Sequence, residues 1–184
     1  MRFTKEKTVG FFILATLMLT QVSCSPGPYG YYRPSAEDGT LVKWGSNLVG
    51  PANAIVLKNQ GYELEVKYEG EIKLQLFVPE GKRIYLKDPG LVVYWEGDAT
   101  NANEYKLDFD NYGFSSNSKE FVGRRRANII QRNGTNYYTS INAGKWSDVL
   151  EVKLPLFETP NGDVIRFNNV VFRRKWGMAV MPIN

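Results

Sequence analysis

A strict alternation of apolar and polar residues runs through positions 61–78. Residues 62, 64, 66 and 68 are apolar or aromatic with charges between them, and residues 71–78 repeat the pattern. Alternation with period two indicates strands that have one buried and one solvated face. A three-residue loop at 69–71 would pair Tyr68 with Ile72 and keep both apolar sets on one side, whereas a two-residue loop would pair Tyr68 with Glu71. The pattern therefore predicts a β-hairpin with Tyr68 opposite Ile72.

Shorter apolar runs predict further strands, and turns rich in Gly, Pro, Asn and Asp separate them. These strands are expected at 40–44, 54–58, 83–87, 91–96, 104–109, 127–132, 137–141, 149–154 and 164–176. The apolar run 178–183 is expected to form a last strand or to cover a sheet edge. No window of about 12 residues shows a helical period. The prediction is an all-β fold, an antiparallel β-sandwich, with a small β-barrel as the alternative.

The first 20 residues have the pattern of an export signal. Arg2, Lys5 and Lys7 form a basic start, and residues 9–20 are mostly apolar and uncharged. That run is too short to span a bilayer, which takes about 20 apolar residues. We therefore predict a signal peptide at 1–23 that is not part of the fold.

The stretch from Leu19 to Cys24 holds the single cysteine of the chain. It resembles the lipobox of bacterial lipoproteins: Val22 and Ser23 precede Cys24, and Gln21 stands where leucine is usual. The resemblance covers residues 1–24. It implies that Cys24 becomes the first residue, carries palmitate and other acyl chains, and holds the protein at the bacterial outer membrane. The alternative is an ordinary signal peptide and a soluble secreted or periplasmic protein.

Proline and glycine dominate the segment after the cysteine. Their density at 25–34 excludes a helix or a central strand. We therefore predict a tether at 24–38, followed by a single β domain at 39–184. The tyrosines at 29, 31 and 32 are expected to pack on the domain or to contact a partner.

The charge and histidine content of the chain reduce the classes of partner and of catalytic site that we expect. Loss of residues 1–23 removes three basic residues and one acidic residue, which lowers the formal net charge from +4 to +2, so nucleic acid is not expected as a partner. The chain has no histidine, the commonest general base and metal ligand. We expect no catalytic residue, no metal site and no cofactor. A hydrolase would need two carboxylates that face each other across a cleft.

Two basic runs are candidates for a docking surface. If they lie on neighbouring strands, their alternate residues would form a stripe suited to phosphate or carboxylate groups. The residues are Arg124, Arg126, Arg173 and Lys175. The alternative is a solvated face that protects a sheet edge.

The four tryptophans are candidates for stacking on sugars. They are Trp44, Trp95, Trp146 and Trp176. The alternative is burial in the core of the β domain.

Together these features predict a non-enzymatic envelope lipoprotein, an accessory or assembly module that docks onto a larger outer-membrane or periplasmic complex. Its expected partners are the membrane, through the lipid anchor, and one or more envelope proteins. The alternative function is a glycan- or peptidoglycan-binding module. An exposed row of tryptophans would favour that alternative, and burial of the tryptophans would oppose it.

Overall fold

The computed structural model describes residues 24–43, 51–98, 100–111, 114–115, 120–124, 133–144 and 147–182. The chain divides into two units, Tyr31–Lys175 and the pair of segments Met1–Gly30 and Trp176–Asn184. The described residues contain strands and no helix, so none of them forms a helix that could cross a membrane.

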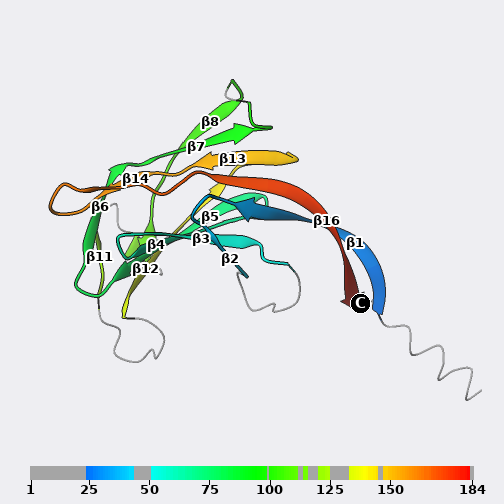
Figure 1. Ribbon diagram of the computed structural model, residues 1–184, viewed down its shortest axis with the longest axis horizontal. Coiled ribbons are helices and arrows are strands. Elements are labelled where there is room, and N and C mark those ends of the chain that lie inside the picture. The colour runs from blue at the N-terminus through cyan, green and yellow to red at the C-terminus, as the bar shows by residue number, and fades with distance from the viewer. Residues whose placement is uncertain are drawn as a thin grey trace, which may run out of the picture. The chain divides into compact units, whose positions relative to one another are not determined.

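The described strands form three antiparallel sheets, none of them closed into a barrel, and this confirms the all-β sandwich (Figure 1). The first sheet has the order β1-β16-β13-β7-β8, with bounds Cys24–Ser35, Val170–Pro182, Val149–Lys153, Gly90–Trp95 and Ala102–Lys106. The second has the order β10-β9-β12-β5-β4-β3-β2, with bounds Phe114–Ser115, Asp110–Asn111, Gly134–Asn142, Glu71–Pro79, Tyr62–Tyr68, Ala54–Asn59 and Thr40–Val42. The third has the order β11-β6-β14-β15, with bounds Glu120–Val122, Arg83–Asp88, Leu156–Glu158 and Val164–Ile165.

The predicted hairpin is confirmed in its register. Strands β4 and β5 pair with Tyr68 opposite Ile72. In the loop the Glu69 N–H donates to the Glu71 carbonyl over 3.1 Å, and Gly70 takes a φ of 83°, which a residue with a side chain rarely adopts. The pairing puts the apolar residues of both strands on one face, where they are fully buried.

The core of the Tyr31–Lys175 unit consists of the inward-facing residues of these sheets. Tyr68 of β4 packs edge-to-face on Tyr32 of β1 and Phe172 of β16, with ring centroids 4.6 and 5.9 Å away. A second group of rings centres on Phe121 of β11, which contacts Tyr137 and Phe157. Burial of each such side chain stabilises the fold by about 1.5–3 kcal/mol, so the aromatic contacts hold the three sheets together.

The segment predicted as a tether is in fact the edge strand β1, next to β16 (Figure 1). Prolines are tolerated there because an edge strand leaves one row of N–H groups outside the ladder. Tyr32 is buried, and its hydroxyl donates to the Ser147 carbonyl over 2.7 Å. Burial raises the pKa of the Tyr32 phenol, and the bond to Ser147 opposes that rise. The compact unit Tyr31–Lys175 therefore includes residues 31–38 of the segment that was expected to be a tether.

Two other expected strands are not confirmed as single strands by the residues that the structure describes. The expected strand 164–176 is two strands, β15 and β16, separated by residues 166–169, where Asn168 donates to Asp38 over 2.7 Å and Asn169 donates to Glu151 over 2.7 Å. These side-chain bonds favour an irregular connection. The expected strand at 127–132 lies outside the described residues.

Candidate functional site

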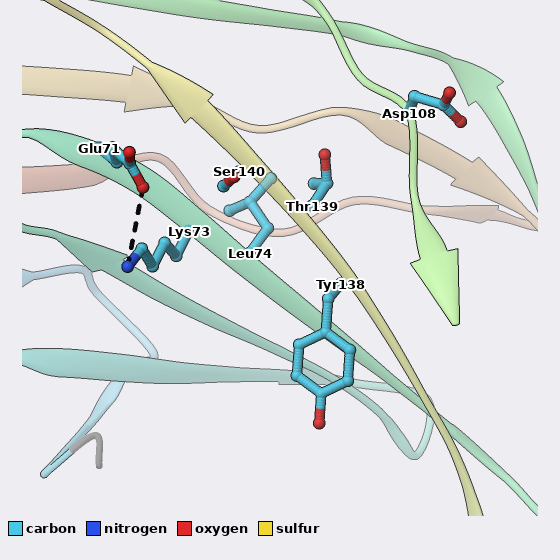
Figure 2. Close-up of a pocket in the computed structure, with 7 residues that line it drawn as sticks. All are labelled: Glu71, Lys73, Leu74, Asp108, Tyr138, Thr139 and Ser140. Carbon is cyan, nitrogen blue, oxygen red and sulfur yellow. Dashed lines mark ion pairs between the residues drawn. The ribbon is translucent and has the colours of Figure 1, made fainter. Parts of the chain in front are cut away.

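An open pocket of about 460 Å³ lies on the second sheet, where β5 and β12 run side by side (Figure 2). All of its lining side chains except that of Leu74 carry a polar group, and they come from β5, from β12 and from the connection between β8 and β9. The lining residues are Glu71, Lys73, Leu74, Asp108, Tyr138, Thr139 and Ser140.

The register of β5 and β12 brings the polar groups of the pocket together. Lys73 pairs with Ser140, so an ammonium and a hydroxyl lie on neighbouring strands. Glu71 forms an ion pair with Lys73, with 3.7 Å between its Oε2 and Nζ. Asp108 lines the opposite side of the pocket, and Figure 2 shows its carboxylate directed away from Glu71 and Lys73. The site thus offers two carboxylates, an ammonium and two hydroxyls, which suit a ligand that has many hydrogen-bonding groups.

Tyr138 adds an aromatic ring to this polar lining. It pairs with Gln75 of β5 on one side and with Asp110 of β9 on the other, and its ring is half-buried. Figure 2 shows the ring on the side of the pocket away from Asp108. The amino-acid sequence does not indicate this site, because the residues that line it belong to no motif. The one signal was the carboxylate at position 108, inside the strand expected at 104–109.

The described residues of the predicted basic stripe do not lie on neighbouring strands. Arg173 and Lys175 are exposed at alternate positions of β16, and Arg174 between them pairs with Asp148 over 4.0 Å. Arg124 follows β11 and is exposed, and its N–H donates to the Thr135 hydroxyl over 2.9 Å. Strands β11 and β16 belong to different sheets.

The condition for a stripe across both runs, which was that they lie on neighbouring strands, is therefore not met for Arg124. Only the pair on β16, Arg173 and Lys175, shares a described strand. Arg126 lies outside the described residues.

The described tryptophans do not form a stacking row. Trp95 of β7 is fully buried in the core, whereas Trp176 of β16 is 67% exposed. Trp44 and Trp146 lie outside the described residues. Trp95 is therefore corrected from a stacking candidate to a core residue, because its position in β7 alternates in register with the buried Leu91 and Val93.

Two acidic residues outside the pocket, Asp98 and Glu63, form hydrogen bonds or ion pairs with nearby residues. The Asp98 carboxylate accepts hydrogen bonds from both the N–H and the hydroxyl of Thr100, each at 2.8 Å, and these bonds lower the pKa of Asp98. Glu63 pairs with Lys58 over 3.0 Å. Across the described residues no three His, Cys, Asp or Glu side chains are grouped closely enough to hold a metal ion.

The end of the chain that would carry the lipid is part of a strand. Cys24 is the first residue of β1, and β1 lies next to β16. A Cβ atom placed on Gly177 of β16 would lie 3.0 Å from the ring of Tyr29, so these two residues are in contact range.

Comparison with known proteins gives no family. No family model matches the chain, and no curated protein matches it. Among solved structures, the chain is similar to the X-ray structure of Northeast Structural Genomics Consortium target SoR45, with 8% identity over 84% of this chain and 85% of that chain and a TM-score of 0.28. At that TM-score the likeness carries no argument about fold or function.

Proposed function

We propose that this protein is a non-enzymatic lipoprotein of the bacterial cell envelope, an accessory module that docks onto a larger outer-membrane or periplasmic complex. The observation that carries the proposal is the junction of the lipobox-like stretch with the fold: Cys24 ends that stretch and begins β1. The seven residues 24–30 can extend over at most about 23 Å. The anchor therefore keeps the β unit close to the membrane surface, where a docking module has to be.

The docking surface in this proposal is the exposed pair Arg173 and Lys175 on β16. Both side chains are donors without acceptor groups, and they suit carboxylates or phosphates on a partner. An accessory module needs such a surface and does not need a catalytic group. A pull-down from detergent-solubilised membranes would identify the partner.

The test of the anchor is Cys24→Ala. Because the thiol is the only nucleophile that can take the lipid, the substitution should abolish palmitate labelling and move the protein from the membrane fraction to precursor or soluble forms. Ser25→Ala is the matched control and should keep both the label and the fractionation. A wild-type protein that begins at Ser25 or later, carries no lipid and is soluble would contradict the proposal.

A second candidate function is glycan binding, and the pocket on β5 and β12 favours it. Tyr138 can stack on a sugar ring, while Ser140, two positions further along β12, can bind its hydroxyl groups. Binding of peptidoglycan fragments should weaken roughly tenfold in Tyr138→Ala, since stacking on a ring contributes about 1 kcal/mol or more. Tyr94→Ala, at a half-buried tyrosine on another sheet, is the control. Equal binding by both variants would exclude this pocket as a glycan site.

A further inference from the structure

Two neighbouring strand segments, 24–30 and 176–182, have no charged side chains. Residues 24–30 of β1 and 176–184, which include the end of β16, contain no Asp, Glu, Lys or Arg. They belong to the same structural unit, and β1 and β16 are neighbouring strands (Figure 1). We call the paired segments 24–30 and 176–182 the terminal ribbon. The charges on β16 stop at Lys175, directly before the ribbon.

The ribbon carries an aromatic surface. Trp176 is 67% exposed, compared with 42% for Val164 and 39% for Leu41, the other exposed large hydrophobic residues among those described. Tyr29 lies beside Gly177 of the facing strand. An exposed Trp176 and a half-buried Tyr29 in a segment without charges suit the membrane–water interface, where an aromatic ring can be partly in lipid and partly in water.

The backbone of the ribbon also suits that environment. Backbone N–H groups without partners are unfavourable in lipid, and β1 is the edge strand of its sheet. Pro26 and Pro28 have no N–H, so this edge has fewer donors to desolvate. The remaining ribbon residues are cysteine, serine, glycine, alanine, valine, methionine and a third proline, all of them small or apolar.

We propose that the terminal ribbon is a second membrane contact, lying in the interfacial region of the bilayer beside the acyl chains on Cys24. The inference rests on the proposed lipid anchor, because Cys24 is the first residue of the ribbon. The occupant is a phospholipid surface, since the ribbon has no charge with which to recognise an ionic protein partner. An acyl anchor alone leaves the orientation of a domain free, and a second contact would restrict it.

The first experiment measures where Trp176 lies in the acylated protein. The protein is reconstituted into vesicles of phosphatidylethanolamine and phosphatidylglycerol that contain phospholipids brominated on their acyl chains, which quench nearby tryptophan. The wild-type fluorescence should be quenched, and Trp176→Phe should lose most of that quenching. Equal quenching in both proteins, or none in either, would overturn the proposal.

The second experiment separates the ribbon from the anchor. The full mature chain with Cys24→Ser carries no lipid, and its binding to the same vesicles is measured by sedimentation. Adding Trp176→Ala should weaken binding about tenfold, because one large apolar side chain no longer enters the interface. Leu41→Ala, which also truncates an exposed apolar side chain, should leave binding unchanged.

Failure of the proposed lipid anchor and failure of the proposed ribbon contact would give different results. If wild-type Cys24 carries no lipid but the Trp176 effect on vesicle binding remains, the anchor fails and the ribbon contact stands. If Cys24 is acylated but Trp176→Ala binds vesicles as well as the parent chain, the ribbon contact fails and the anchor stands. Protection of Trp176 by a co-purifying protein, without quenching by lipid, would also overturn the ribbon contact.

Discussion

A single methyl group at Gly123 should strongly destabilise the fold. Gly123 is buried after β11, against the end of β5. A Cβ atom on Gly123 would lie 1.7 Å from the Pro79 carbonyl oxygen, 2.4 Å from the Pro79 carbonyl carbon and 2.8 Å from the Val78 carbonyl oxygen. These are backbone atoms, so no change of rotamer can relieve the overlap. The turn after β5 has to move in Gly123→Ala.

The expected loss of stability can be calculated from the hydrogen bonds that a movement of this turn would break. The Gly81 N–H donates to the Gly123 carbonyl over 3.1 Å, and the Gly123 N–H donates to the Lys82 carbonyl over 2.9 Å. Each such bond contributes about 1 kcal/mol, and overpacking costs about 1–3 kcal/mol. We expect Gly123→Ala to lower the free energy of unfolding by about 3–5 kcal/mol, a large part of the 5–15 kcal/mol typical of a domain.

The control is Gly81→Ala, in the turn that Gly123 contacts. Gly81 has a φ of 76°, and no atom lies within 4 Å of the position that an added methyl group would take. Only backbone strain opposes this substitution, so the expected loss is about 1 kcal/mol. Comparison of Gly123→Ala with Gly81→Ala therefore distinguishes the cost of a steric overlap from the cost of an unfavourable backbone conformation.

Urea unfolding monitored by tryptophan fluorescence measures both variants, because Trp95 is fully buried in the core. With a slope of about 2 kcal/mol per M, a loss of 3 kcal/mol lowers the midpoint by roughly 1.5 M. A Gly123→Ala midpoint equal to that of Gly81→Ala would refute the reasoning. It would mean that the turn between β5 and β6 can move away without losing its hydrogen bonds.

Two further predictions concern charge and pH. Reversal of Arg173 and Lys175 to glutamate should weaken co-purification of envelope partners several-fold at low salt and less at high salt, since surface electrostatics are screened. Arg124→Glu, on another sheet, is the control, and an equal effect of both changes would contradict docking through β16. Burial, together with the charges of Tyr32 and Tyr105, raises the pKa of Tyr68 to about 12 from 10.0. The unfolded chain then loses this proton near pH 10 while the native state keeps it, so stability falls between pH 10 and about 12. Urea midpoints should show a shallower fall in Tyr68→Phe, and an unchanged fall would contradict the assignment.

The amino-acid sequence alone determined the β4–β5 hairpin. Alternation with period two admits one register in which both apolar sets share a face, and Tyr68 pairs with Ile72 as that register requires. The all-β class followed from the same local signal, repeated along the chain. Local alternation is reliable here because each strand buries one face.

The strand character of β1 depended on tertiary structure. Proline and glycine oppose a central strand, and the local pattern contains nothing that reveals a neighbouring edge. The partner, β16, lies more than a hundred residues later in the chain. Its pairing and the burial of Tyr32 supply the stabilisation that the local composition lacks.

The candidate sites also depended on topology. Glu71 of β5, Tyr138 of β12 and Asp108 line the same pocket. They are brought together because β12 pairs with β5. Arg173 and Lys175 lie on β16 of the first sheet, whereas Arg124 follows β11 of the third sheet. Composition and spacing describe what a strand can present to its surroundings. Which strands become neighbours is decided by the packing of the whole core, so the placement of side chains from distant segments could not be predicted from local pattern.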